Sequence, residues 1–306
     1  MLKHIASVAK RKSGGGVVYA IAAYGIWGIL PIYWKSMKQF PPGDILAHRI
    51  FWSFLFLAAV IGGLRKWGEF RQAFTSTKSI LAVALAAILI STNWLVYIWA
   101  VNSNHIVEAS LGYYINPLLT ILLGVVVLRE KADFWQAIAI ALAFLGVGFL
   151  TYQYGRVPWV ALTLAISFAI YGLVKKLSKL SSLTGLAAET MMVAPLALGF
   201  LVMQVSNSPA AYTSIGGWMV VMVIMTGVVT SVPLLLFAQA AKHVPMSTLG
   251  FVQYLSPSLS LLIGIFVYHE RFTYIDFISF GLIWVALAIF SLSRKEVLAK
   301  FKRKSA

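Results

Sequence analysis

Ten apolar stretches follow one another along this 306-residue chain. A helix needs about 20 mostly apolar residues to cross the hydrocarbon core of a bilayer, so the sequence predicts an all-α membrane protein with ten transmembrane helices. The gaps between the stretches are short, which leaves no room for a soluble domain. The expected spans are residues 17–35, 45–64, 80–101, 105–128, 134–152, 157–174, 183–204, 215–239, 244–267 and 274–292.

The composition agrees with a membrane location. Hydrophobic residues make up 60% of the chain and charged residues 11%, against about 25% charged in an average soluble domain. Such a chain has too few charges to cover a water-facing surface. Cysteine is absent, which excludes a disulfide framework and a cysteine nucleophile.

The positive charges are distributed unevenly. Twenty of the 25 lysines and arginines lie in one set of alternate loops and in the two tails, and four lie in the other set. Lysines and arginines of short loops collect on the cytoplasmic side, so we expect residues 1–16 and 293–306 to be basic cytoplasmic tails. This layout explains the net charge of +16 by topology and by contact with anionic lipid, and it argues against nucleic acid as a partner.

The chain also contains an internal repeat. A shift of 140 residues lays 114–131 over 254–271, and the two expected halves are 17–152 and 157–292, with five spans each. Because five is odd, the second half must enter the membrane from the opposite side, which makes the repeat inverted. The coinciding residues are Tyr114 with Tyr254, Pro117 with Pro257, Gly124 with Gly264 and Glu130 with Glu270.

Inverted repeats are typical of secondary transporters, whose two related conformations open to opposite sides around a site near the midplane. The alternative is a duplication kept for packing, as in a passive facilitator or channel of the same fold. The sequence shows no catalytic group of residues, and its five histidines have no metal-ligand spacing. We therefore expect neither an enzyme nor a bound metal or cofactor.

Four ionisable residues lie about one turn or more inside the ends of the expected spans, where such groups are costly and are usually paired or functional. His48 and Arg49 lie about one turn inside the outer end of the second span, and Glu108 lies at a similar depth in the fourth. Arg49 and Glu108 can therefore form a buried ion pair. The alternative is that the Arg49 guanidinium acts as a gate or grips a substrate carboxylate.

The fourth ionisable residue, Glu189, occupies the repeat position of His48. No cation lies beside Glu189 in its own span, and a desolvated carboxylate can exchange a proton with its surroundings. Glu189 is therefore the candidate for proton coupling. The alternative is a salt bridge to Lys175, Lys176 or Lys242 near the cytoplasmic face.

Other intramembrane residues suit a small-molecule pocket or a helix break. Asn93 and Tyr97 share a helical face, which mixes an amide with a ring as ligand pockets do. Asn116-Pro117 and Ser256-Pro257 occupy the same repeat position, and a proline inside a helix frees a backbone carbonyl. We interpret Pro117 and Pro257 as paired kinks facing the centre, with a packing kink as the alternative.

Six longer motifs stand out along the chain, namely LAHRIFWS (46–53), NWLVYIWAVN (93–102), EASLGYYINP (108–117), ETMMVAP (189–195), STLGFVQYLSP (247–257) and IWVALAIF (283–290). These motifs resemble those of the bacterial RarD family, which belongs to the EamA branch of the drug/metabolite transporter superfamily. The resemblance covers about residues 17–292, and it implies ten helices, a bacterial inner-membrane location and secondary efflux of small metabolites or drugs. It does not imply a particular substrate.

The sequence thus predicts a secondary-active exporter of a small organic solute, with the lipid bilayer and the solute as partners and the proton as a candidate coupling ion. A homodimer is compatible with the sequence. The candidate substrate and coupling residues are His48, Arg49, Asn93, Trp94, Tyr97, Glu108, Tyr114, Asn116, Glu189, Gln253 and Tyr254.

Overall fold

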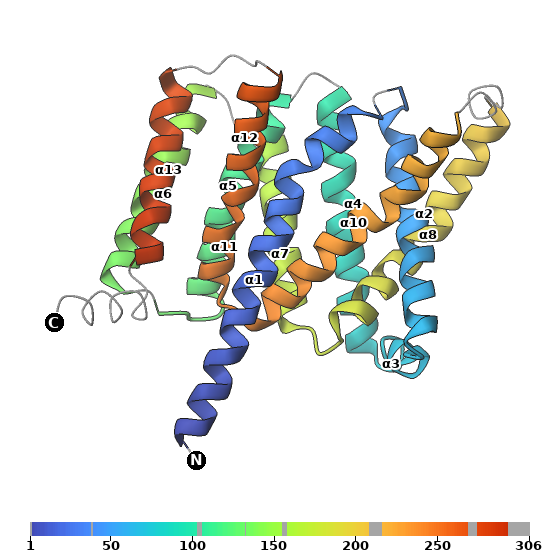
Figure 1. Ribbon diagram of the computed structural model, residues 1–306, viewed down its shortest axis with the longest axis horizontal. Helices are drawn as coiled ribbons and strands as arrows, with labels where there is room; N and C mark the ends of the chain where they lie inside the picture. The colour runs from blue at the N-terminus through green and yellow to red at the C-terminus, as the bar shows by residue number, and fades with distance from the viewer. Residues whose placement is uncertain are drawn as a thin grey trace.

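The computed structural model describes residues 2–37, 39–102, 106–131, 133–154, 158–207, 216–268 and 274–292. Over these residues the regular structure is α-helical throughout (Figure 1), which confirms the all-α prediction for this part of the chain. The helices are α1 (Leu2–Lys35), α2 (Pro42–Gly63), α3 (Trp67–Gln72), α4 (Thr77–Asn102), α5 (Ile106–Val126), α6 (Phe134–Tyr154), α7 (Trp159–Leu177), α8 (Ser182–Asn207), α10 (Gly217–His243), α11 (Met246–Gln253), α12 (Leu255–Tyr268) and α13 (Tyr274–Leu292).

In the part of the chain that the structure describes, seven helical segments are long and apolar enough to cross a membrane, which makes the chain a multi-pass membrane protein. They are Gly15–Lys35, Pro42–Gly63, Thr77–Tyr97, Trp159–Leu177, Ser182–Asn207, Gly217–His243 and Met246–Val267. Three shorter apolar helical segments lie on the three other predicted spans, namely Leu111–Val126, Phe134–Phe149 and Gly281–Phe290.

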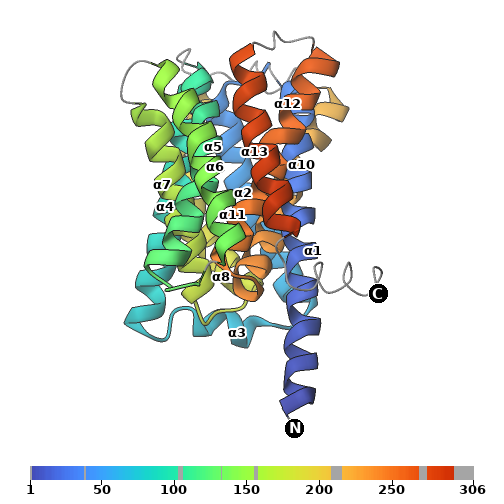
Figure 2. The same ribbon diagram turned by 90° about the vertical axis from the view of Figure 1, so that its left-hand side faces the viewer.

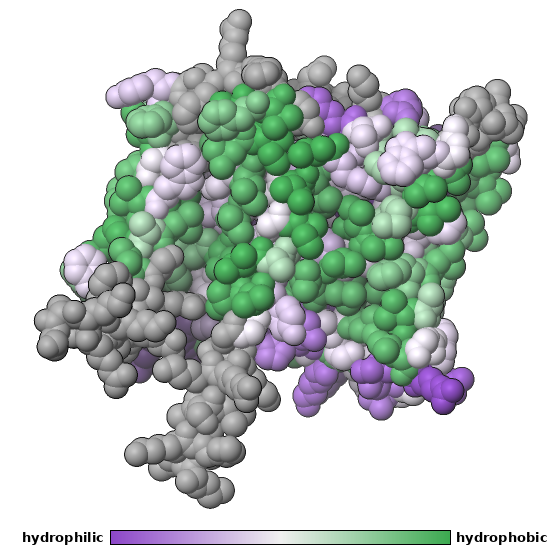
Figure 3. All heavy atoms as spheres, viewed as in Figure 1, coloured by the Kyte–Doolittle hydropathy of each residue, from purple (hydrophilic) through white to green (hydrophobic). Residues whose placement is uncertain are grey.

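The outer surface of the bundle is apolar between two hydrophilic ends (Figure 3). Large side chains such as Ile88, Leu145, Leu196 and Phe266 are exposed. In water a continuous surface of this kind would drive association, whereas in a bilayer it faces the acyl chains. The short helix α3 lies at the end of the bundle from which the N-terminal part of α1 projects (Figure 2), and we call this end the α3 end.

The helices pack around two apolar cores. The larger core joins α1, α2, α4, α7, α8, α10 and α11, and its fully buried aromatic rings are Tyr24, Tyr171 and Phe237. The second core joins α5, α6, α7, α11 and α13 around Ile121 and Ile283. Between lipid-embedded helices the driving force is close packing rather than the hydrophobic effect.

Glycine permits the closest helix contacts. A Cβ atom at Gly227 of α10 would lie 2.4 Å from the carbonyl carbon of Trp52 on α2. A Cβ atom at Gly250 of α11 would lie 2.6 Å from the carbonyl oxygen of Pro117 on α5. Small residues at such crossings let the two backbones approach, so these two glycines fix how α2, α5, α10 and α11 meet.

The two predicted proline kinks differ in the structure. Pro117 lies inside the continuous helix α5. Pro257 follows the break between α11 and α12 at Tyr254. A proline removes the hydrogen bond to the carbonyl four residues earlier, which for Pro257 is the carbonyl of Gln253, the last residue of α11.

Candidate functional site

Arg49 is the most distinctive polar residue within the spans. Its guanidinium carbon lies 4.6 Å from the centroid of the Trp34 ring on α1 and 4.7 Å from that of the Trp94 ring on α4. Its Nε donates a hydrogen bond to Thr230 Oγ1 on α10, at 3.1 Å. We call Arg49, Trp34, Trp94 and Thr230 the Arg49 site, which thus combines four helices.

The predicted ion pair of Arg49 with Glu108 is not tested, because the Glu108 side chain lies outside the described residues. Among the side chains that the structure does describe, Arg49 has no carboxylate within 4 Å. The sequence did not identify Trp34 or Thr230 as neighbours of Arg49.

Asn93 contacts the neighbouring helix rather than an open pocket. Its Nδ2 donates to the carbonyl oxygen of Leu164 at 2.8 Å and to Ser167 Oγ at 3.0 Å, both on α7. Asn93 therefore ties α4 to α7. Tyr97, one turn further along α4, packs its ring against Tyr113 of α5 with the centroids 5.7 Å apart.

A second polar group joins four helices. Asn116 Nδ2 on α5 donates to the carbonyl oxygen of Ala165 on α7 at 2.8 Å. Gln253 Nε2 on α11 donates to Asn116 Oδ1, and Tyr24 of α1 donates through its hydroxyl to Gln253 Oε1 at 3.3 Å. Both amides are buried and form hydrogen bonds with other protein groups. The cluster of Asn116, Gln253 and Tyr24 therefore holds these helices together. Thr120 completes it with weak contacts to both amides, at 3.4 and 3.5 Å.

The two repeat-related tyrosines also meet. The Tyr254 hydroxyl donates to the carbonyl oxygen of Tyr114 at 3.3 Å. The structure therefore places Tyr114, Asn116, Gln253 and Tyr254 in one region between α5 and α11.

Glu189 forms a buried ion pair. Lys175 Nζ lies 2.6 Å from Glu189 Oε1, and each side chain is 4% exposed. The Tyr171 hydroxyl donates to Glu189 Oε2 at 3.1 Å. The structure thus shows the salt bridge that the sequence left open as the alternative for Glu189, and it identifies Lys175 as the partner.

The two other candidate lysines donate to backbone carbonyls at the α3 end. Lys176 Nζ donates to Val244 O at 2.6 Å and to Ala241 O at 3.2 Å. Lys242 Nζ donates to the carbonyl oxygen of Leu180. These contacts join α7, α8 and α10 where their connecting loops meet.

Glu130 caps a helix that is distant in the sequence. Its carboxylate accepts hydrogen bonds from Met246 N at 2.7 Å, and from Ser247 N at 3.0 Å and Ser247 Oγ at 2.9 Å. These amides open α11, where an anion is favoured by the helix dipole. The acidic residue three positions later, Asp133, caps its own helix α6 through Gln136 N at 2.9 Å.

His48 lies near an acid that sequence reasoning missed. Asp44 lies one turn earlier on α2, is 4% exposed, and accepts a hydrogen bond from Gln204 Nε2 of α8 at 3.0 Å. His48 Nδ1 is buried without a hydrogen-bond partner among the described residues. The spacing of four residues, which places Asp44 and His48 on one helix face, was the available signal.

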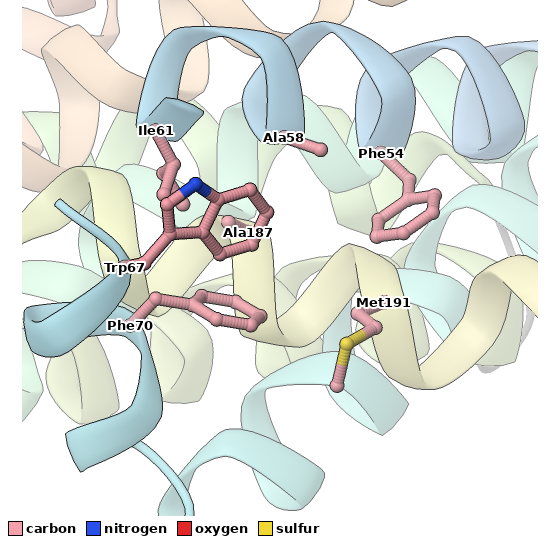
Figure 4. Close-up of a pocket in the computed structure, with 7 residues that line it drawn as sticks. All are labelled: Phe54, Ala58, Ile61, Trp67, Phe70, Ala187 and Met191. Carbon is pink, nitrogen blue, oxygen red and sulfur yellow. The ribbon is translucent and has the colours of Figure 1, made fainter. Parts of the chain in front are cut away.

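Two hollows lie away from these polar groups. An apolar cavity of about 70 Å³ between α2, α3 and α8 is lined by Phe54, Ala58, Ile61, Trp67, Phe70, Ala187 and Met191 (Figure 4). It offers a polar solute no hydrogen bond. A wider polar groove of about 490 Å³ lies at the α3 end, lined by Glu69, Gln72, Thr75, Ser79, Lys179, Leu180, Ser181 and Thr184.

A bundle of apolar helices with a half-buried arginine site and buried polar groups is characteristic of membrane transporters. The chain matches the model of the EamA-like transporter family twice, over residues 14–152 and 157–292. It belongs to that family, and within it to the RarD family, as the sequence motifs indicated. It is therefore a membrane transporter and not an enzyme.

Individual relatives support this assignment. The chain is 47% identical to the uncharacterized transporter YojE of Bacillus subtilis, over 95% of this chain and 96% of that protein. It is 42% identical to protein RarD of Escherichia coli, over 90% and 93% of the two chains, and 40% identical to protein RarD of Streptomyces exfoliatus, over 92% and 89%. One solved structure covers 92% of this chain and 99% of its own with a TM-score of 0.68. Its sequence is 17% identical, so it supports the fold alone.

Proposed function

We propose that this protein is a secondary-active transporter that exports a small organic solute across the bacterial inner membrane. In this proposal ten helices cross the membrane as two inverted halves, residues 17–152 and 157–292, and both termini are cytoplasmic. The α3 end is then the cytoplasmic end.

The observation that carries the proposal is a symmetry of the helix contacts. When each helix is replaced by the corresponding helix of the other half, the extensive contacts are found again. If α1 corresponds to α7, α2 to α8, α4 to α10, α5 to α11 and α12, and α6 to α13, the most extensive helix contacts have counterparts, whereas the smaller contact of α7 with α10 has none of similar extent between α1 and α4. The packing of α1 on α10 matches that of α7 on α4, and the packing of α5 on α7 matches that of α12 on α1. The contacts of α2 with α8 and of α6 with α13 each join two corresponding helices, so they stay the same when the halves are interchanged.

This symmetry supports alternating access. When two inverted halves pack through equivalent contacts, a conformation closed at one end has a related conformation closed at the other. The separate match of the family model to each half adds to this support. The Arg49 site, built by helices from both halves, is the proposed place of the solute, and Glu189 is the proposed proton-coupling group.

Transport into proteoliposomes tests the proposal. Purified protein would be reconstituted and supplied with radiolabelled amino acids, aromatic acids and chloramphenicol, with and without a pH gradient. We expect at least one of these compounds to accumulate above its external concentration, and a proton ionophore to abolish the accumulation. Equilibration without accumulation would identify a passive facilitator, and absence of uptake for the whole panel would contradict the proposal.

A further inference from the structure

The hydrogen-bonding capacity of Arg49 is only partly used. A guanidinium carries five N–H donors in one plane, and among the described residues the one acceptor for Arg49 is Thr230 Oγ1. Trp34 and Trp94 interact with the guanidinium through their ring faces. Such contacts stabilise the charge but accept no in-plane hydrogen bond, so the side chains that the structure describes leave the terminal amines to another acceptor.

The surroundings of Arg49 strengthen its attraction for any anion that binds there. Trp94 is 9% exposed, and charges attract one another more strongly where water is scarce. The fork of an arginine matches the two oxygens of a carboxylate, which it can hold through two parallel hydrogen bonds. A lysine could not reproduce this planar geometry.

The charge of the site limits the anion to one negative charge. Arg49 is the one cation that the sequence places away from the ends of the expected spans. A dianion such as phosphate would keep one charge uncompensated in a poorly hydrated place, which is costly. We infer that Arg49 binds the carboxylate of a singly charged organic solute, and that the transported substrate is therefore an organic monocarboxylate.

The rings around Arg49 indicate what the rest of this solute is like. The rings of Trp34 and Trp94 lie over the guanidinium, with their centroids 4.6 and 4.7 Å from its carbon. They offer apolar surface beside the charge, as ligand pockets with one polar anchor do. The solute thus joins a carboxylate to a compact apolar body. This inference rests on the proposed function, whose site it specifies.

Thermal unfolding of the purified protein, followed by tryptophan fluorescence, tests the inference with a matched pair of probes. Cyclohexanecarboxylate and cyclohexanecarboxamide have nearly the same shape and differ in charge. A ligand that binds the folded protein raises its Tm in proportion to occupancy. We expect the carboxylate to raise the Tm in a concentration-dependent manner and the amide to have no effect.

Variants then connect the effect to Arg49. Arg49→Gln should weaken carboxylate binding about tenfold or more, as the loss of a charge-assisted hydrogen-bond pair implies. Arg49→Lys should weaken it as well, because lysine lacks the fork. The control Arg71→Gln, which changes an exposed arginine of α3, should bind like the unaltered protein.

Three outcomes would overturn the inference. The first is an equal effect of the carboxylate and the amide, and the second is no effect of the carboxylate on the unaltered protein. The third is stabilisation that develops only in Glu108→Gln, since the fork would then be held by the protein's own carboxylate. Because no gradient is needed, failure of this binding test leaves the transport proposal intact. Failure of gradient-driven accumulation would likewise leave carboxylate binding intact.

Discussion

The ion pair of Lys175 with Glu189 permits a quantitative test by Glu189→Gln. Both side chains are 4% exposed, so water cannot rehydrate Lys175 after its partner is neutralised. Removal of one member of a buried pair costs about 3–5 kcal/mol in free energy of unfolding. Glutamine keeps one acceptor oxygen, for Lys175 Nζ, and its amide nitrogen can donate to the Tyr171 hydroxyl, which can accept, so we expect the loss to lie near the lower limit, at about 3 kcal/mol.

A double-mutant cycle and a surface pair provide the controls. Replacement of both charges in Lys175→Met/Glu189→Gln should recover most of the loss, because no buried charge is then left without its partner. The exposed pair Lys66 and Glu69, 3.2 Å apart, should lose less than about 1 kcal/mol in Glu69→Gln. Unfolding would be measured by titration with sodium dodecyl sulfate in mixed micelles. Additive losses in the cycle would refute the reasoning.

The same variant addresses coupling. If Glu189 releases and binds a proton during each cycle, Glu189→Gln should abolish pH-gradient-driven accumulation in proteoliposomes and leave solute counterflow largely intact. Loss of both activities would indicate a role in substrate binding or folding. If both activities survive, the carboxylate serves only the ion pair.

Further predictions concern topology, the predicted outer pair, the cap and a helix crossing. In this cysteine-free chain, a cysteine at position 208 should react with an impermeant reagent added to intact cells, and one at 178 should not. If Arg49 pairs with Glu108 rather than with a solute, Arg49→Glu and Glu108→Arg should each destabilise the protein by about 3–5 kcal/mol, and the double swap should recover part of this in thermal unfolding; additive losses would leave the Arg49 fork to a solute carboxylate. Glu130→Ala should cost about 4–5 kcal/mol, because all three hydrogen bonds from the start of α11 to a charged acceptor are lost, measured likewise. Gly227→Ala should cost about 1–3 kcal/mol by overpacking, whereas Gly199→Ala, with open space around it, should be neutral or stabilising.

The sequence predicted the helices because the bilayer imposes their length and apolar character. Each of the seven long apolar helices lies on a predicted span. The partners of the buried charges depend instead on how each helix is rotated about its axis, which the length of a span does not determine. Three lysines near Glu189 were therefore equivalent in the sequence, and only Lys175 faces it.

Non-local contacts were beyond sequence reasoning for a related reason. Trp34 lies near the end of its helix, where a tryptophan is ordinarily an interfacial anchor, so its position carried no signal for Arg49. Glu130 and Met246 are 116 positions apart, and no local pattern connects an acid after one helix with the start of another. Both contacts follow from the way the helices pack.

The contacts at the α3 end differ in what they would resist. Lys175 and Glu189 belong to the same proposed half, so their ion pair can survive a movement of one half against the other. Glu130 belongs to the first proposed half, and the α11 amides that it binds belong to the second. In the proposed transport cycle, separation of the halves at this end would break its three hydrogen bonds, each worth about 1.5–3 kcal/mol because the acceptor is charged. A shift of a two-state equilibrium from 1:99 to 99:1 requires about 5.5 kcal/mol. The single carboxylate of Glu130 is thus of the right size to hold the α3 end closed while leaving its opening within reach of substrate and proton binding.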